Sequence, residues 1–337
     1  MILHPTVIAN LLAAYISSFM VLYALFYGVQ IVRYWDIENG HELQLVLERK
    51  TYLIATLLGY VFGLQLLSLF LYIFTADSLT PLFVGAMCAA GTLNVDAFGY
   101  PTLVLKIVNF IVAGLWLVLN YADNQGYDYP LIKKKYLLLA FIAPFIVLET
   151  LLESAYFLSM KADVITSCCG SLFSSERTTG LGSEMAALPA LSMLRIFYGV
   201  MFCTLASGIF FYIKSVGGYF YAALSLLMFL VSLVSIVSFI SLYIYELPTH
   251  HCPFCIIMEE YHYLGYLLYL ILFGAVVSGI GVGVLTPFRQ VESLKLMLNG
   301  FIRKLALASL ILYAAFTALV TYEIVTSSLV IAYEVVY

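Results

Sequence analysis

The sequence predicts an all-α integral membrane protein, a bundle of eight transmembrane helices with both termini on the extracytoplasmic side. Three observations lead to this prediction: the composition, the lengths of the apolar segments, and the distribution of Lys and Arg. Of the 337 residues, 64% are hydrophobic and only 10% are charged, whereas soluble domains are about 45–50% apolar and about 25% charged. A soluble fold could not bury this much apolar surface, so we expect a lipid bilayer to surround it.

Eight segments are apolar over the ~20 residues that a helix needs to cross a bilayer. Aromatic residues such as Tyr34, Trp35 and Tyr121 stand at their ends, where such rings favour the membrane interface. We expect a single membrane domain over residues 1–337, with spans at residues 6–32, 51–75, 101–121, 136–160, 190–213, 219–245, 261–287 and 305–332. The first apolar segment is too long for a cleaved signal peptide and lacks its basic start.

The basic residues predict the orientation of these spans. Eleven of the fifteen Lys and Arg residues fall in the first, third, fifth and seventh loops, and only Lys161 and Arg177 fall in the other loops or the termini. Basic loops stay on the cytoplasmic side. Both termini and the even-numbered loops, including the long loop at residues 161–189, are therefore predicted to be extracytoplasmic.

Most of the cysteines fall in these outer loops. Cys252 and Cys255 form a Cys-Pro-Phe-Cys motif directly after His250 and His251. Two cysteines at this spacing can close a disulfide or place two thiolates on one metal ion, and the imidazoles can act as further ligands. We interpret this motif as a redox or metal site, the alternative being a structural disulfide or a polar turn.

The 161–189 loop carries a vicinal pair, Cys168 and Cys169. A disulfide between neighbouring cysteines is strained and therefore labile, and two adjacent thiols can also capture a soft ion together. Cys88 stands alone among small residues, and we interpret it as a plain buried cysteine. Cys203 lies in the middle of the fifth span and is interpreted as a core residue.

A second group of candidate residues lies within the spans. Glu149 and Glu153 are four residues apart and share a helix face, and Lys106 and Arg195 lie at a similar depth. Charges in lipid are costly and should face inward and pair, so we expect Glu153 to pair with Arg195 or Lys106.

Two carboxyl groups are then less obviously neutralised. They are Glu149 and Glu323, the latter near the middle of the predicted eighth span. Buried carboxyls of this kind can relay protons. The alternative is that the intramembrane charges only hold the helices together.

Three functions remain open from the sequence. The first is a membrane thiol oxidoreductase, in which Cys252 and Cys255 face a membrane quinone while Cys168 and Cys169 pass electrons to a soluble extracytoplasmic partner. The second is a protein that binds or translocates Cu(I) or Zn(II), with a soluble metal carrier as partner. Its ligands would be Cys252, Cys255, His250 or His251, and Cys168 or Cys169. The third is a non-enzymatic subunit of a respiratory or assembly complex.

The setting is predicted to be a plasma (inner) membrane with the site facing the periplasm or the exterior. Thiol chemistry of this kind needs an oxidising compartment. The sequence shows no basic face, nucleic-acid motif or nucleotide-binding loop, so we expect neither nucleic acid nor nucleotide as a partner.

Overall fold

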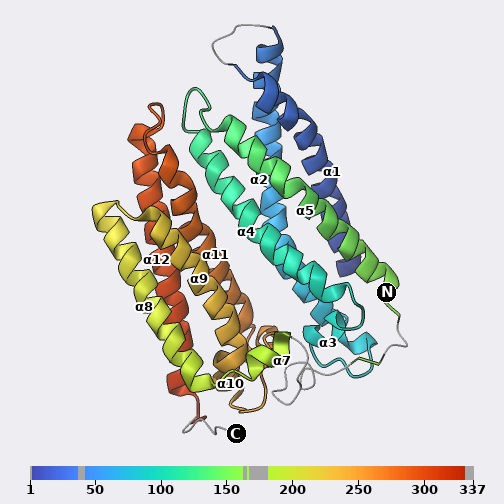
Figure 1. Ribbon diagram of the computed structural model, residues 1–337. Helices are drawn as coiled ribbons and strands as arrows, with labels where there is room; N and C mark the ends of the chain where they lie inside the picture. The colour runs from blue at the N-terminus through green and yellow to red at the C-terminus, as the bar shows by residue number, and fades with distance from the viewer. Residues whose placement is uncertain (1, 37–41, 162–164, 167–180, 331–337) are drawn as a thin grey trace. The chain divides into compact units, whose positions relative to one another are not determined.

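The computed structural model describes residues 2–36, 42–161, 165–166 and 181–330. All regular structure within these ranges is helical, and eight of the helices are long and apolar enough to cross a membrane (Figure 1). The prediction of an all-α integral membrane protein with eight spanning helices is thereby confirmed. The side on which the termini lie stays a prediction.

The chain divides into two compact units, each with four spanning helices. The first unit comprises residues 1–75, 96–160 and 284–302, and the second comprises residues 76–95, 161–283 and 303–337. The spanning helices of the first unit are α1 (Pro5–Tyr34), α2 (Glu42–Ser78), α4 (Gly99–Asp123) and α5 (Ile132–Ser159). The second unit holds α8 (Ala190–Lys214), α9 (Gly218–Ser235) with its continuation, α11 (Leu264–Leu285) and most of α12 (Lys295–Thr326).

In the first unit, α5 packs against both α1 and α4 (Figure 1). The α1–α5 contact is close because α1 turns small residues toward its neighbour, and small residues let helix backbones approach in membranes. The Ser18 hydroxyl lies 2.6 Å from that of Thr150, and the Tyr15 hydroxyl lies 2.9 Å from that of Ser154.

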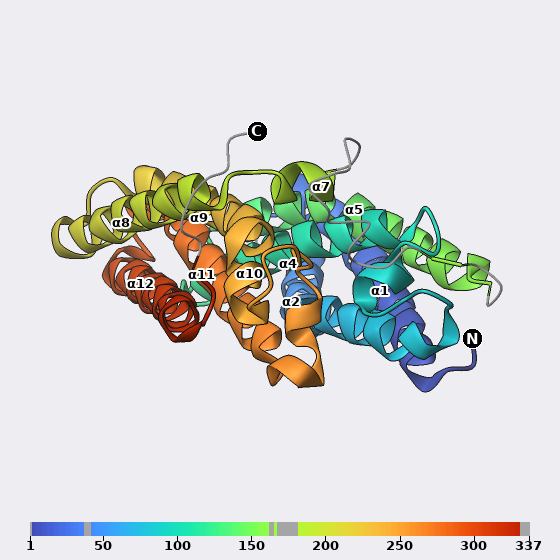
Figure 2. The ribbon, with the colours of Figure 1, turned by 90° about the horizontal axis from the view of Figure 1, so that it is seen from below.

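In the second unit, α8 packs against α9, and both lie beside α11 and α12 when viewed end-on (Figure 2). The sixth span continues past α9 through the π-helical turn η2 (Ile236–Ile240) into α10 (Ser241–Tyr245). Such turns release backbone carbonyls from the helical ladder and are frequent at functional sites.

Short elements connect the spans. The segment between α2 and α4 contains the 3₁₀ turn η1 (Thr80–Leu82) and the short helix α3 (Ala89–Leu93), whose five residues are all buried. Helix α7 (Leu181–Ala186) precedes α8, and three further 3₁₀ turns are η3 (Cys255–Ile257), η4 (Glu259–Tyr261) and η5 (Thr286–Phe288).

Helix α12 begins at Lys295, well before the eighth span expected from residue 305. Its first turns are amphipathic: Leu298 and Ile302 are buried, while Lys295 and Arg303 are exposed. Such amphipathic turns are not uniformly apolar, so hydropathy alone does not predict them as part of the span. The helix ends at Thr326, so Glu323 lies in its last turn and not near the middle of a span.

Candidate functional site

The loop that carries the Cys-Pro-Phe-Cys motif is held in place by two tyrosines of the flanking helices. The Tyr245 hydroxyl donates to the Cys252 carbonyl at 2.5 Å, and the Tyr269 hydroxyl donates to the Pro253 carbonyl at 2.8 Å. Cys252 and Cys255 are both buried. A loop with its backbone tied on both sides keeps its thiols in a defined position.

Cys88 joins this motif from the segment between α2 and α4. It is fully buried and directly precedes α3. Its Sγ lies 3.6 Å from the Sγ of Cys252, and the sulfur atoms of Cys88, Cys252 and Cys255 all lie within 4.8 Å of one another. The interpretation of Cys88 as a plain buried cysteine is therefore wrong, because it belongs to a cluster of three thiols, which we call the thiol site.

His250 contacts the thiol site at one corner. Its Nε2 lies 3.4 Å from the Sγ of Cys255, and its half-buried ring packs edge-on against Tyr245 with the ring centroids 4.6 Å apart. His250 does not belong to the set of ligand atoms that lie within 4.8 Å of one another. It is a neighbour of one thiol.

His251 serves a different purpose. Its Nδ1 donates to the carbonyl of Val237 at 2.9 Å, one of the carbonyls of the π-helical turn η2. Burial lowers the pKa of this imidazole, against an opposing effect of the hydrogen bond to Val237. The ring is therefore neutral at neutral pH and carries its proton on Nδ1, so His251 fastens the loop to the sixth span.

The predicted second cysteine pair, Cys168 and Cys169, lies outside the described residues. The nearest described residue before it, Thr166, bonds to the segment that carries Cys88: its amide donates to the Val84 carbonyl at 3.1 Å and its hydroxyl donates to the Gly91 carbonyl at 2.8 Å. The amide of Gly91 in turn donates to the Cys88 carbonyl at 2.9 Å.

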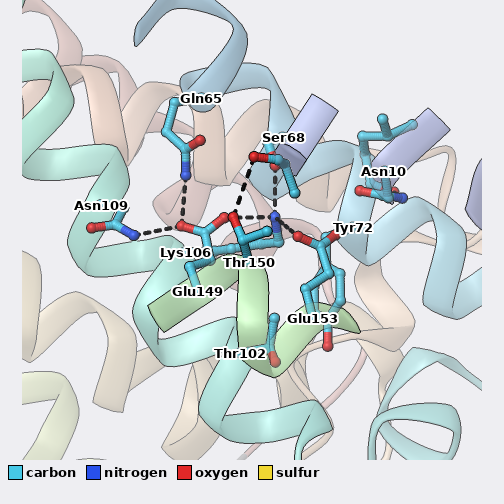
Figure 3. A network of polar contacts seen from close by, with 12 residues as sticks. Asn10, Gln65, Ser68, Tyr72, Thr102, Lys106, Asn109, Glu149, Thr150 and Glu153 are labelled. Atoms are coloured by element: carbon cyan, nitrogen blue, oxygen red, sulfur yellow. Dashed lines mark hydrogen bonds and ion pairs between the residues drawn. The ribbon is translucent and has the colours of Figure 1, made fainter. Parts of the chain in front are cut away.

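The first unit contains a network of buried ions (Figure 3). The Lys106 ammonium lies 2.8 Å from Glu149 and 3.0 Å from Glu153, and these side chains are at most 3% exposed. The amides of Gln65 and Asn109 donate to the other oxygen of Glu149 at 2.6 and 2.5 Å. The expected pairing of Glu153 with Lys106 is present, and Glu149, expected to be poorly neutralised, shares the same cation.

Three other intramembrane predictions were wrong. Arg195 is exposed on α8 and does not face inward, because it lies only five residues from the start of the helix, where a long side chain can extend to the interface. Glu323 is half-buried in the last turn of α12. Cys203 is exposed and not in the core. Its apolar sequence neighbours could not indicate this, because the lipid-facing side of a spanning helix is as apolar as its core-facing side.

Sequence reasoning also missed a second buried ion pair. Lys135 Nζ lies 2.6 Å from Asp123 Oδ2, and both side chains are fully buried. Lys135 is one of the eleven basic residues in the loops that are predicted to be cytoplasmic. The only sequence signal was its position opposite an acidic residue across the short connection from α4 to α5.

Comparison of the chain with protein-family models, curated proteins and solved structures gives no match. The site must therefore be interpreted from its own chemistry.

Proposed function

We propose that this membrane protein binds a soft metal ion, Cu(I) or Zn(II), at the thiol site of Cys88, Cys252 and Cys255. The observation that carries the proposal is the convergence of three buried thiols from two separate segments. Two thiols are enough for a disulfide, whereas a metal ion uses three or four ligands.

The sulfur spacing supports a metal site. With Zn–S bonds of about 2.3 Å in a tetrahedral arrangement, neighbouring ligand sulfurs lie about 3.8 Å apart. The Cys88–Cys252 separation of 3.6 Å is close to this value, and the third sulfur lies within 4.8 Å of both. No carboxylate belongs to the set among the described residues, and an all-sulfur set favours soft ions over Mg²⁺ or Ca²⁺.

A fourth ligand has two candidate sources. His250 already contacts Cys255, and a modest ring movement would bring its nitrogen toward the other two sulfurs. Cys168 and Cys169 stay predicted participants on sequence grounds.

Thiol–disulfide exchange is the second candidate function, and the Cys88–Cys252 contact favours it. Oxidation of this pair would form one S–S bond and release two electrons and two protons, which a membrane quinone would accept to become a quinol. Cys168 and Cys169 would then exchange with a soluble partner. A third reading, a non-enzymatic subunit of a larger complex, keeps the thiols structural.

The membrane and its face belong to the same proposal. The strong bias of Lys and Arg toward the odd-numbered loops supports an outward-facing thiol site in a plasma membrane, where a soluble metal carrier or redox protein would reach it. A reporter fused after Tyr337 should be active outside the cytoplasm. Activity of the reporter only in the cytoplasm would overturn the orientation.

Metal binding is tested on the purified full-length protein in detergent. We expect one Cu(I) or Zn(II) per chain by elemental mass spectrometry, and loss of that ion in Cys88→Ser, Cys252→Ser and Cys255→Ser. Cys203→Ser is the matched control, because this exposed thiol lies on the lipid-facing side of α8, and it should retain the ion.

A thiol-alkylating mass tag separates the two candidate functions. Protection of three thiols by added metal, reversed by a chelator, supports the metal site. If the wild-type protein binds no added Cu(I) or Zn(II) and its Cys88 and Cys252 react with the tag only after reduction, the metal proposal fails and thiol exchange takes its place.

A further inference from the structure

The buried ions of the first unit form a second site, independent of the thiol site, that the metal proposal does not use. Lys106 is at its centre. Its ammonium group has three N–H donors, and three acceptors surround it: Ser68 Oγ at 2.6 Å, Glu149 Oε1 at 2.8 Å and Glu153 Oε2 at 3.0 Å. Every donor is used, which is the arrangement of a charged lysine.

Glu149 is arranged as a carboxylate. One of its oxygens faces the Lys106 ammonium, and the other accepts hydrogen bonds from the side-chain amides of Gln65 and Asn109. All three neighbours are donors. A protonated carboxyl group would place its own hydrogen against one of them, so this environment suits the ionised form.

Glu153 has a different environment. It is fully buried, one of its oxygens faces only Lys106, and its Oε1 has no hydrogen-bond partner among the described residues (Figure 3). No described donor compensates a negative charge on this oxygen.

In the part of the chain that the structure describes, the elements packed around Glu153 bring no second cation. Helix α2 contributes the neutral Tyr72, whose hydroxyl donates to the Gly99 carbonyl and whose ring centroid lies 5.3 Å from the Lys106 ammonium. Helix α1 contributes hydroxyl groups to α5. Helix α5 itself adds Glu149 and the buried Tyr156, and α4 adds Lys106.

The charges in this network therefore do not balance. Two carboxylates and one ammonium leave a net charge of −1 within the helical bundle, at a position about two turns from the ends of α4 and α5. Buried uncompensated charge is costly, and a carboxyl group without compensation takes up a proton. A metal cation is excluded from the position between the two carboxylates, because the Lys106 ammonium already occupies it.

We propose that the Lys106–Glu149–Glu153 network is a proton-binding site that holds one exchangeable proton on Glu153. With the proton bound, the network has no net charge, with Lys106 and Glu149 ionised and Glu153 neutral. Release of the proton from Glu153 to water leaves a net charge of −1. The site is thus suited to couple proton uptake to a change elsewhere in the membrane protein.

The Lys135–Asp123 pair, near the other ends of α4 and α5, provides an internal contrast. It is equally buried, but one cation faces one carboxylate at 2.6 Å. Asp123 also accepts a hydrogen bond from the Leu131 amide, and Lys135 donates to Asn120. This pair is balanced without a proton and should not exchange one.

Infrared spectroscopy of the full-length protein in nanodiscs, with ¹³C-labelled glutamate, tests the proposal. A protonated glutamate gives a carbonyl stretch that is distinct from the carboxylate bands and shifts with the label. We expect one such signal per chain at neutral pH, decreasing as the pH is raised. Its absence from the folded wild-type protein would show that both carboxyls are ionised, and the proposal would fail.

Variants then test the charge count. Glu153→Gln should abolish the signal. Glu149→Gln should abolish it as well, because Glu153 would then be balanced by Lys106 and would ionise. Glu323→Gln, at the half-buried carboxyl of α12, and Asp123→Asn should leave the signal unchanged.

Either network variant is sufficient if the other does not fold. Persistence of the full signal in a folded Glu153→Gln protein would assign the proton to another glutamate. Persistence in a folded Glu149→Gln protein would show that the charge count does not decide protonation. Either result would overturn the proposal. A purely structural network would show no protonated glutamate at all.

Discussion

The two units hold their helices together with different polar groups. Among the described residues of the first unit, five acidic or basic side chains are buried, and these are Lys106, Asp123, Lys135, Glu149 and Glu153. Among the described residues of the second unit, the buried polar groups of the spanning helices are hydroxyls. There Tyr313 donates to the Ser225 carbonyl at 2.7 Å, and Ser309 donates to the Ala275 carbonyl at 2.8 Å.

This difference supports the proposed proton-binding role of the buried charges in the first unit. Hydroxyl groups and glycines bring helices together at little cost in a bilayer, and the second unit shows that this fold can be built in that way. Charges are not needed for packing, so an unbalanced group of three in the first unit calls for a chemical role. In the second unit the proposed metal site lies in the connecting segments, where Cys88, Cys252 and Cys255 meet.

The largest effect is expected from removing the central cation of the first unit. Lys106→Met leaves the buried Glu149 carboxylate without its cation, and breaking a buried ion pair costs about 3–5 kcal/mol. The free energy of unfolding in mixed micelles should fall by that amount. The double variant with Glu149→Gln should recover part of the loss, because it removes the carboxylate that Lys106→Met leaves without its cation. A single Lys106→Met variant as stable as the wild type would mean that the charges are not coupled.

An intermediate effect is expected at the glycine contacts of the second unit. A Cβ on Gly279 of α11 would collide with the hydroxyls of Ser225 and Ser309, so Gly279→Val should destabilise by about 1–3 kcal/mol through overpacking. Gly199→Val on α8 is the matched control, because nothing lies within 4 Å of that position. Equal melting temperatures for the two variants would contradict the close packing of α9, α11 and α12.

A smaller effect is expected from a single hydroxyl of the second unit. Tyr313→Phe removes the bond to the Ser225 carbonyl and the 3.0 Å contact with the Ser225 hydroxyl, worth about 0.5–1.5 kcal/mol. Tyr322→Phe on the same helix should be neutral, since that ring is 63% exposed. If Tyr313→Phe lowered the free energy of unfolding as much as Lys106→Met, the two units would not differ in how strongly they depend on their buried polar groups.

The smallest effect concerns the buried imidazole of the second unit. Because burial lowers the pKa of His251 in the folded protein, the unfolded chain binds a proton more readily. The stability that this residue provides is therefore complete above the ordinary histidine pKa of ~6.5 and is lost as the pH falls below it.

His251→Asn keeps a neutral amide donor toward the Val237 carbonyl and removes the titration. From about pH 8 to about pH 5, either side of the histidine pKa, the melting temperature of the wild type should fall more than that of the variant. Parallel curves for the two proteins would show that His251 does not titrate on unfolding.

Part of the candidate chemistry was predictable from local spacing. Glu149 and Glu153, four residues apart, lie together as the helical period requires, and Lys106 meets them because a cation within a span must find a carboxylate. Cys252 and Cys255 lie together because only two residues separate them along one loop. Cys88 could have been found from one weak signal: it follows the second span of the first four, as Cys252 and Cys255 follow the second span of the last four.

Other positions could not be derived in this way. Hydropathy does not distinguish a core-facing residue from a lipid-facing one, so it could not predict that Cys203 and Arg195 are exposed. The Lys135–Asp123 pair depends on how the connection between α4 and α5 turns, which is decided by contacts such as the hydrogen bond from the Leu131 amide to Asp123.

The sequence by itself determined the class of protein and the number of its spanning helices, because the cost of exposing polar backbone and charge to lipid acts on each segment separately. Only the tertiary structure decided which groups meet. It added Cys88 to the Cys252–Cys255 motif and placed two carboxylates on one lysine, because such contacts join segments far apart in the chain and depend on how the helices pack.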